Sequence, residues 1–340
     1  MDFRDFWYVV SESRALKANQ VIARQVLDEW LAIYRDEQGQ AIALQDRCLH
    51  RASQLSRGTV RNGQLTCGYH GWVYDGTGKV VQVPSLGPDG KKLGNRCAKR
   101  YPVTERDGFV YVRLNESPEE ALEPFAMPHY GEPGYKTLRL LNVFDNDVTN
   151  CAENFIDIPH TAFVHRGIFR STKNEALTAT IERKHGSVQV SYGGEKNNLG
   201  FFQKFLNPGG VPLVHKDNFY MPNVTSVEYV AGKHRHFIIT SQSVPATPRS
   251  TWVYTDLTYN YGLWTGLAAP FVRAYGQKII DQDLEILQNQ MKVIEKYGAE
   301  FNNTPADMIH VFIESIRNEL AAGRDPRKLP DKSHQVEFFV

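Results

Sequence analysis

Residues 48–72 read CLHRASQLSRGTVRNGQLTCGYHGW, and this stretch decides the fold of the first part of the chain. It holds two short boxes, residues 48–50 and 67–70, with sixteen residues between them. Each box offers one thiolate and one imidazole, so two loops together present four ligands to a small metal centre. A [2Fe-2S] cluster of mixed ligation needs this set, because thiolates hold one iron while neutral imidazoles hold the other. The predicted cluster ligands are Cys48, His50, Cys67 and His70.

A structural zinc site with two Cys and two His is the main alternative for these four side chains. Zinc sites usually place Cys with Cys and His with His, whereas each box here is mixed. Gly68, Gly71 and Gly76 also indicate strand and turn structure around the second box. The pattern therefore favours the cluster. The remaining cysteines, Cys97 and Cys151, have no such neighbours and are predicted to be structural thiols.

The bulk properties are those of an ordinary enzyme. The 340 residues, 41% hydrophobic and 23% charged, suit two domains better than one. The formal charge of +1 and the lack of a Lys/Arg block argue against nucleic acid as a partner. Four cysteines suit a reducing compartment. The first ten residues lack a signal pattern, and the apolar stretch 257–272 is too short and too interrupted to span a membrane. We therefore expect a cytoplasmic protein.

The order of predicted elements indicates an α+β chain. Residues 21–114 alternate short strands with turns, including hairpins around residues 36–39 and 75–78. The acidic, Pro-rich segment 116–133 cannot continue a sheet and is predicted to be a linker between domains at 1–115 and 134–340. Beyond it, strand patterns alternate with helical patterns, which favours an antiparallel sheet with helices packed on one side. The strands are expected at 137–144, 187–192, 225–230, 236–241 and 252–259, and the helices at 147–165, 276–297 and 305–320.

A second group of metal-binding side chains lies just after the linker. Glu153, Asp157 and His160 follow one another at helical spacings of four and three, so they are expected on one face of the helix predicted at 147–165. Pro159 should kink that helix and allow His165 to turn toward the same point. A pair of core histidines bonded to backbone is the alternative. So many buried ionisable groups are costly unless something pairs them, which favours a metal site.

Two histidines and one carboxylate on one face of a ferrous ion leave three positions open, as dioxygen activation requires. The sequence therefore needs a third ligand. The helix predicted at 276–297 offers three candidates, Asp281, Asp283 and Glu285, and the residues alone do not choose among them.

The two boxes, extended to residues 48–51 and 67–72, resemble the cluster-binding motifs of Rieske ring-hydroxylating oxygenases of the single-subunit type. Residues 153–165 are similar to the iron-binding motif of the same family. Leu49 stands where the family often has Pro, and Ala52 where it often has Gly, so we expect altered loop packing and unaltered metal binding. The family pattern of an Asp followed seven residues later by Gln matches Asp283 and Gln290, and it selects Asp283 as the third ligand.

This resemblance implies the fold and the activity. It implies an all-β Rieske [2Fe-2S] domain followed by a helix-grip (START-like) catalytic domain with a curved antiparallel sheet and a mononuclear Fe(II). The activity would be hydroxylation or oxidative demethylation of an aromatic or other cyclic apolar substrate, with monooxygenase or demethylase chemistry favoured over cis-dihydroxylation. The competing hypothesis is a Rieske electron-transfer or ligand-carrying protein without a working mononuclear iron. The identity of the substrate does not follow from the sequence.

The resemblance also implies partners. Dioxygen chemistry needs more electrons than one ferrous ion holds, and the chain has no dinucleotide fingerprint, so we expect an NAD(P)H-dependent reductase, acting directly or through a ferredoxin. In the family the cluster of one subunit faces the iron of the next, across an Asp that matches Asp157 here, between His70 and His160. That arrangement implies a homotrimer. A carboxylate that only orients His160 is the alternative for Asp157.

The substrate-binding residues are the least defined. Aromatic side chains are frequent between residues 201 and 264, and we expect most of them in the core of the sheet. They include Phe202, Phe205, Phe219, Tyr220, Trp252, Tyr254 and Trp264.

Overall fold

The computed structural model describes residues 1–87, 95–116, 118, 120, 122–166, 176–193, 207, 210–232 and 235–339. The chain forms two compact units. One contains residues 4–126 and 245–247, and the other contains residues 1–3, 127–244 and 248–340. The change of unit between Ala126 and Met127 falls inside the segment 116–133 that we predicted to be a linker. The exchange of two three-residue pieces between the units was not expected from the sequence.

The described residues of the unit that begins at Arg4 form three small antiparallel sheets, as the alternating strands and turns predict. The sheets have the strand orders β1-β11-β10, β2-β3-β4-β9 and β5-β6-β7-β8. Both predicted hairpins are present, as β3 with β4 and β7 with β8. The strands are β1 (Trp7–Glu12), β2 (Val21–Val26), β3 (Glu29–Arg35), β4 (Ala41–Gln45), β5 (Thr59–Arg61), β6 (Gln64–Thr66), β7 (Val73–Tyr74), β8 (Val80–Gln82), β9 (Arg100–Tyr101), β10 (Val103–Arg106) and β11 (Phe109–Arg113).

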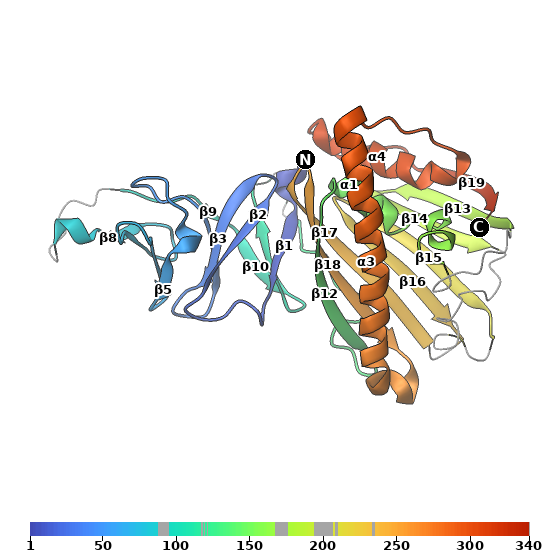
Figure 1. The fold of residues 1–340 in the computed structure, drawn as a ribbon, viewed down its shortest axis with the longest axis horizontal. Coiled ribbons are helices and arrows are strands. Elements are labelled where there is room, and N and C mark those ends of the chain that lie inside the picture. The colour runs from blue at the N-terminus through green and yellow to red at the C-terminus, as the bar shows by residue number, and fades with distance from the viewer. Residues whose placement is uncertain are drawn as a thin grey trace. The chain divides into compact units, whose positions relative to one another are not determined.

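The other unit is dominated by one eight-stranded antiparallel sheet (Figure 1). Its strand order, β12-β18-β17-β16-β15-β14-β13-β19, is close to a meander whose two ends are supplied by β12 and the last strand of the chain. All five predicted strands of this region are present. The strands are β12 (Lys136–Phe144), β13 (Ala176–Lys184), β14 (Ser187–Gly193), β15 (Leu213–Tyr220), β16 (Val224–Ala231), β17 (Arg235–Thr247), β18 (Ser250–Asn260) and β19 (Lys332–Phe339).

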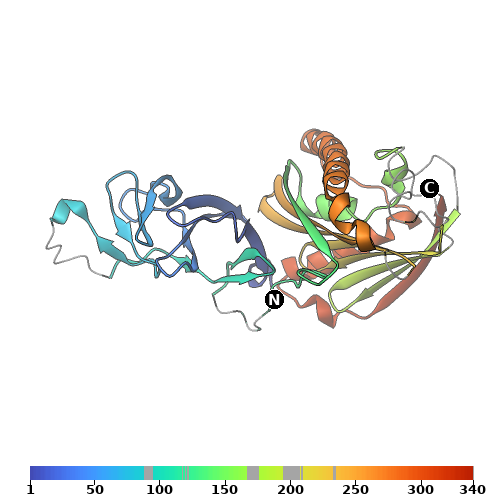
Figure 2. The same ribbon diagram turned by 90° about the horizontal axis from the view of Figure 1, so that it is seen from below.

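In the described part of the chain, three α-helices pack with this sheet: α1 (Val148–Asn154), α3 (Thr265–Tyr297) and α4 (Met308–Ala321). Helix α3 lies across the sheet, and Figure 2 shows it nearly end-on against one face. Gly276 brings α3 close to the sheet, because a Cβ at this position would lie 2.4 Å from Leu257 Cδ1 on β18. One apolar core lies between α3 and the sheet, and a second lies between α4 and strands β13 and β14. Among the described residues, no helix is both long enough and apolar enough to cross a bilayer.

Two helix predictions were wrong in extent. The helix expected at 147–165 ends at Asn154, and a short 3-10 turn follows at Pro159–Ala162. The Asp147 side chain caps its start by accepting from Thr149 N, but the segment does not continue as a kinked helix with Glu153, Asp157 and His160 on one face. The helix expected from residue 276 begins at Thr265, with Pro270 inside it. Burial of Ala268 and other apolar side chains against the sheet offsets the local cost of that proline.

Candidate metal centres

The two boxes form neighbouring loops in the first unit. Residues 48–50 follow β4, and residues 67–70 connect β6 to β7. Cys48 and Cys67 are buried at 2% exposure, His50 is half-buried and His70 is exposed. The two imidazole rings lie 4.5 Å apart between centroids. The tertiary structure therefore brings the four predicted ligands together, with the thiols inward and the imidazoles toward the surface.

Backbone hydrogen bonds hold both loops in tight turns. Ala52 N donates to Cys48 O at 3.0 Å, and Gly71 N donates to Cys67 O at 3.1 Å. Ala52 has a φ of 54° and Gly71 a φ of 71°, both in the left-handed region that glycine adopts without steric cost. An Ala at position 52 therefore adopts a backbone conformation that costs it more than it would cost the Gly often found there in the family.

The surroundings of these four side chains suit a metal cluster. His50 Nδ1 is buried and has no hydrogen-bond partner, an arrangement that costs free energy unless the nitrogen binds something else. Burial raises the pKa of the Cys67 thiol, so a metal is needed to hold it as a thiolate. Tyr74 Oη lies 3.3 Å from Cys48 Sγ as a donor, and Trp72 stacks on His50 with centroids 5.0 Å apart. The residues present fit a [2Fe-2S] group.

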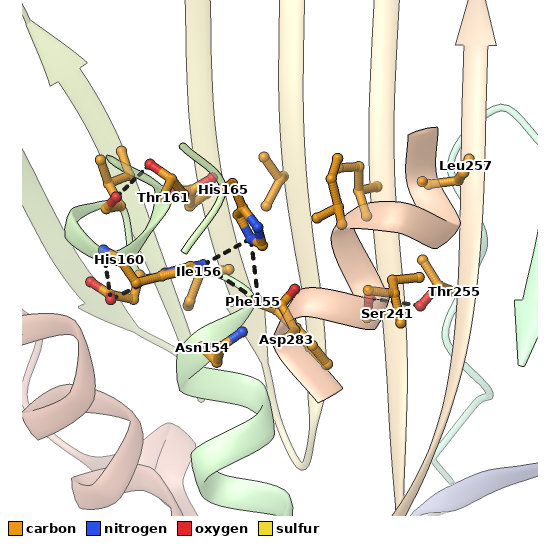
Figure 3. Close-up of a pocket in the computed structure, with 18 of the residues that line it drawn as sticks. Asn154, Phe155, Ile156, His160, Thr161, His165, Ser241, Thr255, Leu257 and Asp283 are labelled. Carbon is orange, nitrogen blue, oxygen red and sulfur yellow. Dashed lines mark hydrogen bonds and ion pairs between the residues drawn. The ribbon is translucent and has the colours of Figure 1, made fainter. Parts of the chain in front are cut away.

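The second predicted group meets on the helix side of the eight-stranded sheet. His160 Nε2 and His165 Nε2 lie 3.3 Å apart, and Asp283 Oδ1 lies 3.7 Å from the first and 3.2 Å from the second. One ligand atom from each residue lies within 4.8 Å of the other two. Figure 3 shows the three side chains pointing toward one another, from the segment after α1 and from α3. Side chains more than 100 residues apart thus converge on one point.

Hydrogen bonds on the far side of each imidazole orient the two rings. His165 Nδ1 lies 3.0 Å from Gln282 Oε1, and His160 Nδ1 lies 3.2 Å from Asp157 Oδ2. Because these oxygens only accept, both Nδ1 atoms carry the proton and both Nε2 lone pairs face Asp283. Asp283 Oδ1 is itself buried without a hydrogen-bond partner. Three acceptors that converge in this way repel one another unless a cation lies between them, so these residues fit a metal ion.

The pKa of His160 reflects the negative charge around this group of side chains. Burial alone would lower the pKa of His160, but the Asp157 and Asp283 carboxylates outweigh it and raise that pKa above its usual value.

The competing carboxylates point elsewhere. Asp281 and Glu285 are exposed on α3, and Asp281 accepts a hydrogen bond from Gln277. Glu153 lies 2.5 Å from His310 Nδ1 on α4, a pairing that raises the pKa of His310. The sequence did not lead us to expect a role for Gln282 beside His165, although Gln282 directly precedes the candidate ligand Asp283.

A cavity of about 110 Å³ opens beside the three converging ligands. Its wall is mainly apolar and comes from β12, from β15 to β18, from α1 and the segment after it, and from α3. The aromatic side chains in this wall are Phe144, Phe155, Tyr229, Phe237 and Tyr275. None of them was named from the sequence. Of the aromatic residues that were named, Phe202 and Phe205 lie outside the described residues, and the other five do not line this cavity: Phe219, Tyr220, Trp252, Tyr254 and Trp264.

Comparison with known families finds one match in each part of the chain. Residues 6–102 match the Rieske [2Fe-2S] domain, and residues 144–323, more than half of the chain, match the vanillate O-demethylase oxygenase C-terminal domain. The chain is a Rieske non-haem iron oxygenase family member. This membership confirms the family resemblance, and the α+β fold class that the order of predicted elements indicated is confirmed as well.

Several relatives of this Rieske oxygenase family member are similar over part of their length. The oxygenase component of dicamba O-demethylase from Stenotrophomonas maltophilia is 31% identical over 216 residues, which are 62% of each chain. The tert-butanol monooxygenase/tert-amyl alcohol desaturase oxygenase subunit of Aquincola tertiaricarbonis is 31% identical, over 55% of this chain and 40% of the relative. The chain thus spans less than two thirds of these relatives in the aligned regions.

Solved structures share the fold over nearly the whole chain. Dicamba monooxygenase bound to dicamba superposes with a TM-score of 0.76 at 23% identity, covering 95% of this chain and all of the other. NdmA of Pseudomonas putida CBB5 with caffeine superposes with a TM-score of 0.78 at 22% identity, covering 94% and 92%. The large antiparallel sheet with few helices is therefore the catalytic-domain fold expected from the resemblance.

Proposed function

We propose that this chain is the oxygenase component of a system that hydroxylates or oxidatively demethylates an aromatic or other cyclic apolar substrate. The observation that carries the proposal is the convergence of His160, His165 and Asp283 beside an apolar cavity, in a chain that also has a Rieske domain. The net reaction consumes one dioxygen, two electrons and two protons, inserts one oxygen atom into a C–H bond and releases one water. At a methoxy or N-methyl carbon the product is an unstable hemiacetal or hemiaminal that loses formaldehyde.

In this proposal His160, His165 and Asp283 hold Fe(II), which supplies dioxygen binding and activation when present. Gln282 and Asp157 keep the two imidazoles in the tautomer that a metal needs. The apolar wall excludes water and holds a flat molecule near the ligands. Cys48, Cys67, His50 and His70 hold the [2Fe-2S] cluster. Electrons come from an NAD(P)H-dependent reductase, directly or through a ferredoxin, in the cytoplasm.

The proposal is tested on the anaerobically reconstituted chain. Three irons and two acid-labile sulfides per chain, together with oxygen uptake that rises when substrate and reductase are added, are expected. A screen of methoxylated aromatics, aromatic acids and polycyclic compounds, read out by oxygen uptake and formaldehyde release, identifies the substrate. Two irons per chain and no oxygen uptake would instead support the electron-transfer alternative.

Asp157 is further proposed to carry electrons between subunits of a homotrimer, from His70 of one chain to His160 of the next. Its side chain is 32% exposed while one oxygen contacts His160, and His70 is exposed in its own unit. Asp157→Asn should keep all three irons and lower coupled turnover by about 100-fold, at the upper end of effects seen when a partner of a metal ligand is lost.

Asp281→Asn is the matched control, because Asp281 is an exposed carboxylate on α3 that points away from the ligands. Normal coupled turnover in Asp157→Asn would reject the electron-transfer role. Sizing under native conditions tests the trimer, and a monomer with full activity would contradict it.

A further inference from the structure

The first turns of α3 expose apolar side chains where a helix normally faces water with polar ones. The 3-10 turn Gly262–Trp264 and the start of α3 lie at the lower edge of the eight-stranded unit in Figure 1. The structure describes all of residues 262–274, and among those that are exposed only Arg273 has a charged side chain. Helix faces in contact with water carry polar and charged residues, so this composition indicates a surface that contacts something other than water.

Four large side chains make up this surface, which we call the α3 ridge. Leu263 is 99% exposed, Trp264 63%, Leu267 69% and Phe271 56%. At roughly 150–250 Å² for each fully exposed side chain, the α3 ridge presents roughly 400–700 Å² of apolar surface. An exposed apolar patch of this size is often functional.

The size and shape of the α3 ridge favour a lipid bilayer over a second copy of the chain. A stable protein–protein interface buries about 800 Å² on each partner, more than the α3 ridge offers. Leu263 is almost fully exposed, so the ridge projects outward. An outward-projecting ridge of Leu, Trp and Phe can insert at the boundary between headgroups and acyl chains, where apolar side chains of peripheral proteins lie.

The charges beside the α3 ridge are those that an anionic bilayer attracts. Residues 257–280 contain no Asp or Glu. The two charged residues of this stretch, Arg273 and Lys278, are both exposed. Cations next to an inserted apolar surface gain energy from anionic headgroups, whereas carboxylates there would be repelled.

A row of side chains connects the α3 ridge to the cavity beside the metal ligands. Leu267, Phe271, Tyr275 and Ile279 follow one another at intervals of four along α3. Residues four apart in a helix are neighbours on its surface. Tyr275 and Ile279 line the cavity. An apolar molecule dissolved in a bilayer would therefore meet largely apolar side chains from the exposed end of the helix to the cavity wall.

From these observations we infer that the α3 ridge docks the chain on an anionic lipid bilayer, with Arg273 and Lys278 at the headgroups. The docking is peripheral and is independent of the proposed function. Its consequence, the entry of an apolar substrate from the bilayer along the row of side chains on α3, rests on that function.

The test is sedimentation of the anaerobically reconstituted full chain with vesicles. One kind contains equal parts of phosphatidylcholine and phosphatidylglycerol, and the other contains phosphatidylcholine alone. The wild type should bind the anionic vesicles more tightly, by about fivefold for each cation that reaches the headgroups. Arg273→Gln should weaken binding to the anionic vesicles and leave binding to the neutral vesicles unchanged.

The variant Leu263→Gln combined with Leu267→Gln should lower binding to both kinds of vesicle by at least about tenfold, because each inserted leucine contributes by hydrophobic burial. Both positions are exposed, so the double variant should fold like the wild type. Val293→Gln is the matched control, because Val293 lies on the same helix and is 51% exposed. It should bind vesicles like the wild type.

Three results would overturn the inference: no vesicle binding by the wild type, unchanged binding by the double variant, or an equal loss in Val293→Gln. Sizing of the wild type and the double variant accompanies the assay. An oligomer that the double variant dissociates, in a chain that does not bind vesicles, would assign the α3 ridge to a contact between copies. Oxygen uptake is measured separately, so a chain that binds vesicles and consumes no oxygen refutes only the proposed function.

Discussion

Replacing Gln282 by leucine should weaken metal binding at the His160, His165 and Asp283 group while leaving the fold intact. Gln282 Oε1 accepts from His165 Nδ1 at 3.0 Å and so fixes both the rotation and the tautomer of the imidazole. Leucine keeps the size of the side chain and removes the acceptor. The His165 ring can then turn, and either nitrogen can carry the proton.

The expected magnitude follows from this single lost hydrogen bond. Removing a partner that orients a metal-bound His lowers metal affinity by about 10- to 100-fold, which is about 1.4 to 2.7 kcal/mol. The folded metal-free chain should lose only about 1 kcal/mol, because Gln282 is half-buried and its amide can reach water. Gln282→Glu keeps an acceptor at the same position and should bind iron at least as tightly as the wild type.

Iron binding is measured by anaerobic dialysis against buffers of graded free Fe²⁺, followed by assay of iron and acid-labile sulfide. Iron in excess of sulfide reports the mononuclear site, since the cluster contains equal numbers of both. Gln288→Leu is the control, because Gln288 lies on the same helix and bonds to Asp145 at the surface. A midpoint for Gln282→Leu within twofold of the wild type would refute the orienting role of this side chain.

Three further outcomes are expected. Gly276→Ala should push α3 away from Leu257, which lies 2.4 Å from the added Cβ, and so lower iron occupancy more than thermal stability, as iron assay and calorimetry will show. Asn146→Ala should destabilise the fold by about 2 to 4 kcal/mol in urea titration, because this fully buried amide links the start of α1 to α3 through Leu287 O and Gln290. Glu153 raises the pKa of His310, so their pairing stabilises the fold below about pH 6.5 and is lost as pH rises through the raised pKa. Over that range the stability advantage of wild type over Glu153→Gln should shrink, and a constant difference would contradict the pairing.

Short-range sequence patterns were enough to predict the hairpins of the first unit. Hairpins are short-range features, so turn residues and strand residues a few positions apart suffice to find β3 with β4 and β7 with β8. The prediction of a helix at 147–165 was wrong beyond Asn154 because residue spacings of three and four are compatible with a helix but do not require one. The chain leaves the helix after Asn154, and the tertiary contacts of His160 and His165 determine the conformation that follows.

Asp283, the proposed third metal ligand, lies on the buried face of α3. The buried residues of α3 recur every three or four positions, at Ala268, Val272, Gly276, Ile280, Asp283, Leu287 and Met291. Asp283 lies on this stripe, whereas Asp281 and Glu285 are exposed. The burial pattern along α3 therefore supports Asp283, which the family resemblance selected and the residues alone did not.

By itself, the sequence indicated the family and the α+β fold class and supplied the proposed ligand types and their order, because thiolates, imidazoles and turn residues at short spacings have few alternative uses. Only the tertiary structure decided which distant side chains meet: Asp283 with the two histidines, and Gln282 behind His165. The physical reason is that these contacts depend on how α3 lies on the sheet and on the pairing of neighbouring strands, and burial across such distances leaves no local spacing in the sequence.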